Sequence, residues 1–188
     1  VKLIEERIKV SAVEGNSFAV ACEIEEKILQ QALAANDIRQ ASRSYRNLST
    51  WRRELKDYEA AAEAEKKNLA LLEPANNPMA LALSQFELAK IEQARSNYDA
   101  ALAWAEQATA ILKPQNQPLA RLLVETLLGK IAIEADRYGQ ALTYLENALT
   151  AFHAARTAAS SQEKSALAIA QQFTAIAYTR LSAYFEAT

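Results

Sequence analysis

The stretch Leu72-Glu73-Pro74-Ala75-Asn76-Asn77-Pro78 returns 40 residues later as Leu112-Lys113-Pro114-Gln115-Asn116-Gln117-Pro118. Both prolines and one asparagine keep their register across this step. A helix tolerates proline in its first turn, whereas the residue before a proline tends to end a helix. Each stretch therefore predicts a loop that closes one helix and opens the next. Recurrence at a fixed step predicts a chain built from repeats.

Other positions agree at the same 40-residue step. We call a set of four residues spaced 40 apart a column. One column contains only aromatic residues, one only alanine and one only aliphatic residues, and a fourth has small residues in three of its four copies. A further column is leucine with a single threonine exception. These columns are Phe18, Tyr58, Tyr98 and Tyr138; Ala21, Ala61, Ala101 and Ala141; Ile8, Leu48, Leu88 and Leu128; Lys9, Ser49, Ala89 and Gly129; and Leu29, Leu69, Thr109 and Leu149. The agreement supports four copies of one unit.

Composition favours an all-α protein. The 188 residues are 51% apolar, with 3 glycines and 4 prolines, and strong helix formers dominate. A net charge of -2 argues against a protein that coats nucleic acid or an anionic membrane. The single cysteine excludes an internal disulfide and fits a reducing, cytoplasmic setting. Apolar runs fall short of the ~20 residues of a membrane span.

Each repeat is expected to hold two antiparallel helices, because its inner turn has only two or three residues. One such pair cannot bury its own apolar face, so neighbouring pairs must stack. The expected helices are 1–14 and 17–34, 38–55 and 58–73, 78–95 and 97–113, and 119–136 and 138–157. The corresponding repeats are about 1–37, 38–77, 78–117 and 118–157, which together form one array over residues 1–157.

Residues 158–188 follow a different pattern. Ser160 and Glu163 form a capping-box signature, and apolar residues then recur to the end of the chain without a turn signal. Tyr178 falls at the 40-residue step, yet nothing interrupts the helix before it. The segment predicts one long capping helix that covers the last repeat.

The repeat resembles the tetratricopeptide (TPR) family. The residues that carry the resemblance are Leu128-Gly129, Tyr138, Ala141 and Ala148, with their counterparts 40 and 80 residues earlier. The usual TPR period is about 34 residues, so the longer repeats of the kinesin-light-chain type are more similar. The resemblance implies a right-handed α-α superhelix of four helix-turn-helix repeats. One departure is that the aromatic residue expected late in each second helix is replaced, by Glu25, Glu65, Ala105 and Leu145.

Arginine is concentrated in the first helix of the second repeat. Five of the eleven arginines lie between residues 38 and 53. Arg39, Arg43, Arg46, Thr50 and Arg53 follow steps of four and three, so they share one helical stripe, with Asn47 beside it.

The TPR resemblance implies that first helices line a concave groove. The candidate groove residues are then Arg43, Arg46, Asn47, Thr50, Arg53, Phe86, Glu87, Lys90, Gln93, Thr126, Lys130 and Glu134. Guanidinium groups bind carboxylates through two parallel hydrogen bonds, so the expected ligand is a peptide or protein segment, and an acidic one suits this wall best. The alternative is that these cations pair with acidic residues of neighbouring helices or simply keep the array soluble.

Catalytic chemistry has little support in this sequence. His153 and Cys22 are the only histidine and cysteine, and they belong to the last and first repeats. Cys22 is expected in the core, and Trp51 is expected to pack between repeats. The Glu25-Glu26 pair is expected on a solvated helix face. We therefore expect no enzyme, cofactor or metal site.

The sequence favours a protein-interaction module that binds its partner in the groove. An alternative is a structural scaffold that self-assembles through its terminal helices. The first helix carries apolar residues such as Leu3 and Ile4, and no capping segment precedes them in this sequence. A sensor or regulatory domain of a larger regulator is a third possibility. RNA binding is disfavoured because the net charge is negative and the basic stripe is confined to one helix.

Overall fold

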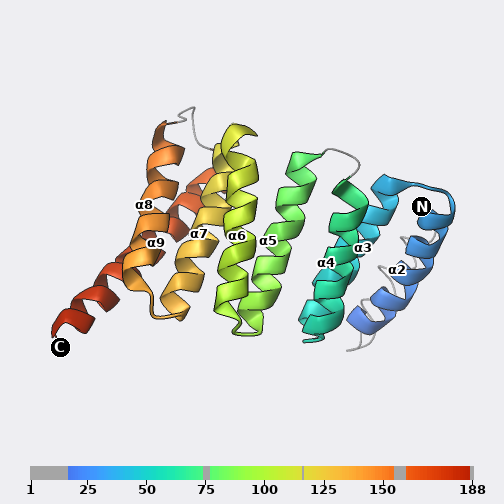
Figure 1. The fold of residues 1–188 in the computed structure, drawn as a ribbon, viewed down its shortest axis with the longest axis horizontal. Coiled ribbons are helices and arrows are strands. Elements are labelled where there is room, and N and C mark those ends of the chain that lie inside the picture. The colour runs from blue at the N-terminus through green and yellow to red at the C-terminus, as the bar shows by residue number, and fades with distance from the viewer. Residues whose placement is uncertain (1–16, 74–76, 116, 155–159, 187–188) are drawn as a thin grey trace. The chain divides into compact units, whose positions relative to one another are not determined.

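The computed structural model describes residues 17–73, 77–115, 117–154 and 160–186 (Figure 1). Within these ranges the chain is helical, without β-strands. The helices are α2 (Ser17–Ala34), α3 (Ile38–Glu54), α4 (Tyr58–Leu72), α5 (Pro78–Ala94), α6 (Tyr98–Leu112), the short 3-10 helix η2 (Lys113–Gln115), α7 (Pro118–Glu134), α8 (Tyr138–Ala154) and α9 (Ser161–Glu186). None of the helices described is both long enough and apolar enough to span a membrane.

The helix boundaries follow the 40-residue step. Pro78 and Pro118 are the first residues of α5 and α7, as the loop pattern predicted. The remaining helix ends lie within about three residues of the predicted ones. The expected helix over residues 1–14 lies outside the described residues. The chain divides into two compact units, one up to Ile91 and one from Glu92, so the boundary falls inside α5.

Four turns share one geometry. In each, the second residue after the helix has a positive φ, and none of these residues is glycine: they are Asn36, Lys56, Ser96 and Asp136, with φ of 54°, 62°, 60° and 58°. The amide of Lys56 donates to the Arg53 carbonyl, and the amide of Asp57 donates to the Arg52 carbonyl. This is the hydrogen-bond pattern of a Schellman motif, which satisfies the last carbonyls of a helix. The Asp57 carboxylate then caps α4 by accepting from the Ala60 amide.

In the first unit, α3 packs between α2 and α4 (Figure 1). Cys22, Leu48 and Ala64, one residue from each helix, form a buried cluster. Trp51 packs against this cluster, which confirms its predicted structural role. Burial raises the pKa of the Cys22 thiol, so the predicted core position of this cysteine is also confirmed.

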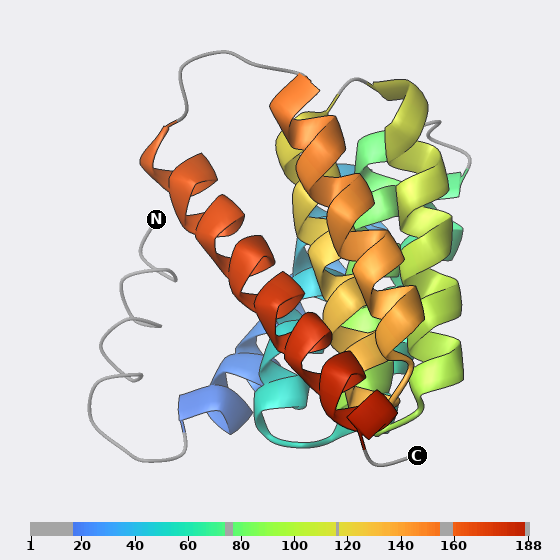
Figure 2. The same cartoon turned by 90° about the vertical axis from the view of Figure 1, so that its left-hand side faces the viewer.

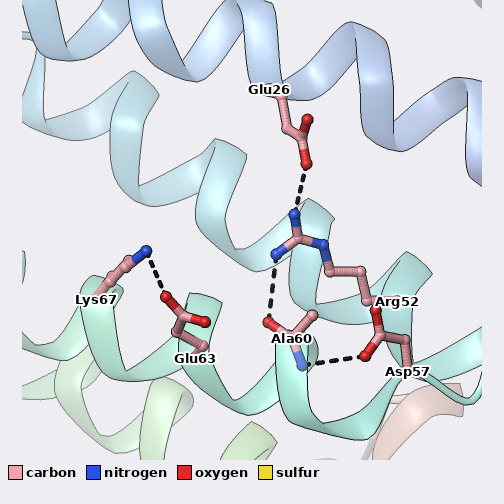
Figure 3. A network of polar contacts seen from close by, with 6 residues as sticks. All are labelled: Glu26, Arg52, Asp57, Ala60, Glu63 and Lys67. Carbon is pink, nitrogen blue, oxygen red and sulfur yellow. Dashed lines mark hydrogen bonds and ion pairs between the residues drawn. The ribbon is translucent and has the colours of Figure 1, made fainter.

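Arg52 connects the same three helices. Its guanidinium donates to the Glu26 carboxylate of α2 and to the Ala60 carbonyl of α4 (Figure 3). On the exposed surface of α4, Lys67 pairs with Glu63 one turn away. Arg52 therefore has a structural role.

In the second unit, α7 packs against α6 and α8. Gly129 of α7 faces Leu145 of α8 so closely that a Cβ atom on the glycine would lie 2.4 Å from the leucine Cγ. The glycine is therefore required for this close approach of two helices.

Helix α9 covers α7 and α8 obliquely (Figure 2). Ala166 and Ala170 join a buried cluster with Leu122 and Ala148. The predicted capping box is present, because the Ser160 amide donates to Glu163 and the Glu163 amide donates to the Ser160 hydroxyl. This backbone hydrogen bond holds the pKa of Glu163 below its usual value.

Candidate functional site

A hollow of about 480 Å³ lies on the first unit beside the arginine stripe. We call it the arginine hollow, and its lining residues are Arg39, Ser42, Arg43, Arg46, Asn47, Thr50 and Glu87. All except Glu87 come from α3, and Glu87 comes from α5. The four- and three-residue steps of the sequence thus place Arg39, Arg43 and Arg46 on the same wall. Arg39 was on the predicted stripe but not among the predicted groove residues.

These three arginines are exposed. No residue that the structure describes forms a hydrogen bond or ion pair with any of them. Guanidinium groups commonly pair with nearby carboxylates, so three unpaired ones on one helical face form a local positive potential.

The other predicted cations of the first unit already have partners. Lys90 donates to both carboxylate oxygens of Glu87, at 3.0 and 2.9 Å, and lies 5.4 Å from the centre of the Phe86 ring. Arg53 is half-buried and pairs with its neighbour Glu54 at 3.2 Å. Neither Arg53 nor Lys90 lines the hollow. These two residues thus pair with acids of their own helices, not with the acids of neighbouring helices that the alternative named.

The remaining predicted residues belong to the second unit. Gln93 donates to Glu134 at 2.8 Å, and Lys130 lies 3.8 Å from the same carboxylate group. Thr126 is buried and donates to the Leu122 carbonyl. A groove that also includes these residues stays a prediction.

The solvated position predicted for Glu25 is wrong. Glu25 is 1% exposed, and its two oxygens accept hydrogen bonds from Ser44, at 2.8 Å, and Asn47, at 3.1 Å. Because Asn47 also lines the arginine hollow, this bond fixes the orientation of its amide. Its neighbour Glu26 is exposed and pairs with Arg52. A buried carboxylate is tolerated here because both of its oxygens have donors.

Glu65 occupies the equivalent position 40 residues later but has a different environment. It is fully buried, and Asn68 donates to its Oε2 at 3.4 Å and to Ser84 at 2.7 Å. Glu65 Oε1 and Asn68 Oδ1 are both buried and accept no hydrogen bond from the described residues. Burial raises the pKa of Glu65 to about 7, and the nearby charge of Arg46 opposes this shift. A proton on Glu65 would provide a donor where two acceptors otherwise lack one.

Comparison with known proteins identifies the fold. No protein-family model and no curated protein matches the chain. A putative kinesin light chain from Podosopora anserina with nearly identical TPR-like repeats is 17% identical, covers 99% of this chain and 88% of its own, and gives a TM-score of 0.74. The chain has a TPR-like repeat fold.

Two further structures share the TPR-like fold. BtubC (BKLC) from P. vanneervenii is 13% identical over 96% of this chain and 81% of its own, with a TM-score of 0.67. The apo form of RapI is 16% identical over 88% of this chain and 63% of its own, with a TM-score of 0.54. The predicted helical-repeat fold and the predicted similarity to kinesin-light-chain repeats are both confirmed.

Proposed function

We propose that this TPR-like chain is a protein-interaction module, and that its arginine hollow binds an acidic segment of a partner protein. The observation that carries the proposal is the set of three exposed arginines, Arg39, Arg43 and Arg46, which have no carboxylate partner among the described residues. Structural similarity to a putative kinesin light chain and to RapI adds support at the level of fold only.

The spacing of the arginines suits an extended ligand. Arg39 and Arg46 are seven residues apart on one helix, so their backbone positions are separated by roughly 10 Å along the axis. A segment in the polyproline II conformation advances about 3.1 Å per residue with three residues per turn, so carboxylates three residues apart lie on one face and match this distance. The exposed Thr50 and the oriented amide of Asn47 add polar contacts at one end of the hollow.

Glu87 limits which ligands fit. It lines the hollow opposite α3, but both of its oxygens already accept from Lys90. Its remaining negative charge disfavours a carboxylate at that wall and keeps the acidic groups on the α3 side. The hollow sits on packed helices, so binding does not require the receptor to order itself first.

The test is a binding titration with fluorescent acidic peptides that carry glutamates three residues apart. Simultaneous Arg39→Glu, Arg43→Glu and Arg46→Glu changes should weaken binding at least about tenfold, since arginine contacts of this kind often contribute a kcal/mol or more each. Binding by the native chain should also weaken with added salt.

The matched control reverses three exposed lysines of the same unit, Lys27→Glu, Lys66→Glu and Lys67→Glu, which changes the net charge equally. This control should retain most of the native affinity. Equal loss in both triple variants would show a general charge effect, and full binding by the arginine variant would refute the proposal.

Self-association is a second candidate, favoured by apolar residues on α9. Ile169 is 44% exposed and Phe185 is 70% exposed. The apolar residues predicted to act at the other end, Leu3 and Ile4, lie outside the described residues. Light scattering over a range of protein concentrations tests this candidate, and a constant monomer mass would exclude it.

A further inference from the structure

A second hollow, of about 380 Å³, lies within the second unit among α6, α7 and α8. We call it the acceptor hollow, and its lining residues are Glu106, Thr109, Ala110, Lys113, Glu125, Leu128, Tyr144 and Asn147. It coincides with the one break in the leucine column of the repeat. Leucine stands at positions 29, 69 and 149, whereas position 109 is threonine. The smaller, polar side chain leaves space and adds a hydroxyl group.

Both hydroxyl groups of this hollow have already donated their hydrogen. Thr109 donates to the Ala105 carbonyl at 3.0 Å, and Tyr144 donates to the Glu106 carboxylate. Burial, together with the hydrogen bond to Glu106, raises the pKa of Tyr144 to about 12, so this donor persists at neutral pH. The Thr109 oxygen therefore keeps acceptor capacity toward the hollow, whereas the Tyr144 oxygen already accepts from the Gln140 amide at 2.8 Å.

Glu125 adds a carboxylate with one oxygen that accepts no hydrogen bond from the described residues. The residue is 3% exposed, and its Oε1 accepts from Arg121 at 3.0 Å. Its Oε2 is buried and accepts no hydrogen bond from the described part of the chain. A buried carboxylate oxygen without a donor is costly, and because Glu125 lines the hollow, a ligand there that brings a donor would offset this cost.

We propose that the acceptor hollow binds a primary ammonium group, supplied by a lysine side chain of a partner or by a small free amine. An ammonium group offers three donors and no acceptor, which complements the oxygens of Thr109, Glu106 and Glu125. Its charge also matches the two carboxylates. Lys113 is exposed and Asn147 is exposed, so the lining groups that can donate lie at the solvent side.

A guanidinium group fits less well. Guanidinium binds a carboxylate best through two parallel hydrogen bonds, which need both oxygens. Arg121 already occupies one oxygen of Glu125, so only Oε2 remains for a ligand. A single point charge such as ammonium can use one oxygen from each of several groups.

The experiment is a two-dimensional NMR titration of the whole chain with propylamine and, separately, with a lysine residue blocked at both its amino and carboxyl ends. Saturable shifts are expected around residues 106–113, 125–128 and 144–147. Tighter binding of the blocked lysine would identify a partner side chain as the source, and tighter binding of propylamine would identify a free amine. The same lysine with its ε-amine acetylated should not bind.

Two variants remove different parts of the hollow. Thr109→Leu restores the residue that the repeat carries elsewhere and fills the space, while Glu125→Gln keeps the shape and removes the charge. Each should weaken ammonium binding by about tenfold or more, because a charge-assisted hydrogen bond or the space for it is lost. Glu63→Gln, on an exposed face of α4, is the matched control and should bind as the native chain does. No saturable shift at these residues, or native affinity in both hollow variants, would overturn the proposal.

Discussion

The two units use different chemistry at the same position of the repeat. The column late in the second helices holds Glu25 and Glu65 in the first unit but Ala105 and Leu145 in the second. All four side chains are buried, with exposed fractions of 1% or less. The repeat therefore keeps a buried position while its chemistry changes from carboxyl to hydrocarbon.

A second column changes together with the first. Nineteen residues after each glutamate stands a serine, and Ser44 donates to Glu25. Nineteen residues after Ala105 the chain has Val124, which is buried. The buried Glu25 thus has a serine donor, and Ala105 has an apolar residue at the same offset, whereas nineteen residues after Leu145 stands Lys164, which is exposed. A stacked helix pair therefore tolerates either a polar or an apolar side chain at this buried position.

The largest expected effect comes from placing a glutamate, as in the first unit, at the equivalent buried position of the second unit. Leu145→Glu would place a carboxyl group at a fully buried position that packs against Gly129, which has no side chain to donate a hydrogen bond. A buried charge without partners should lower the free energy of unfolding by about 4 kcal/mol or more. Urea unfolding followed by circular dichroism measures the change. Leu145→Met, expected to cost less than about 1.5 kcal/mol, controls for the loss of leucine itself.

The next effect depends on pH and belongs to the first unit. Glu65 has a pKa near 7 in the folded chain against 4.5 as the ordinary value. Between these two values only the folded state holds the proton, so the unfolding free energy should fall as pH rises and level off above 7. The loss should reach roughly 3 kcal/mol.

Glu65→Gln should remove this slope. The glutamine amide can donate to Asn68 Oδ1 while its oxygen accepts from Asn68 Nδ2, as a protonated carboxyl would. Urea melts at pH 4.5, 6 and 8 compare the variant with the native chain. If both showed the same pH slope, Glu65 would not be the titrating group.

A smaller effect tests the close approach in the second unit. Gly129→Ala would place a Cβ atom 2.4 to 2.9 Å from three atoms of the buried Leu145 side chain. Overpacking of this kind should destabilise the chain by about 1–3 kcal/mol. Gly139 has nothing within 4 Å of an added Cβ, so Gly139→Ala should instead stabilise by up to about 1 kcal/mol. Thermal melts of the two variants should shift in opposite directions.

The smallest effect concerns the turns, where the two units agree. Lys56 and Ser96 hold the left-handed conformation in the first and second units, at φ of 62° and 60°. Glycine adopts this conformation without the cost of about 1 kcal/mol that other residues bear. Lys56→Gly and Ser96→Gly should each raise the unfolding free energy by up to about 1 kcal/mol. Unequal gains would show that the turns also differ between the units.

Most of the fold was predictable from the period alone. The loops at Pro78 and Pro118, the short inner turns and the capping box of Ser160 and Glu163 are local signals, and each is present in the structure. The burial of Glu25 was missed because its neighbour Glu26 suggested a solvated face. The 40-residue step could have predicted this burial, because Glu25 and the apolar Leu145 occupy equivalent positions of the repeat.

The candidate site was predictable only in part. Helical spacing correctly grouped Arg43 and Arg46 on one wall, because that spacing is local. The sequence could also have predicted that Lys90 is ion-paired, because Glu87 lies one helical turn before it. The contact of Gln93 with Glu134 spans 41 residues and depends on how α5 and α7 stack, so no short motif predicts it.

Helix α9 runs without a break through the position where the 40-residue step would place another turn. Tyr178 stands where a fifth second helix would begin, and its hydroxyl group bonds to Glu146 of α8. No three-residue turn precedes it, so the helix continues straight to Glu186 and carries Phe185 into solvent (Figure 2). Helix α9 thus keeps the 40-residue register of the repeats. Without a turn, however, it cannot fold back on itself as a helical hairpin. Within the described residues, α9 therefore packs on α7 and α8 as one long helix instead of adding another helix pair.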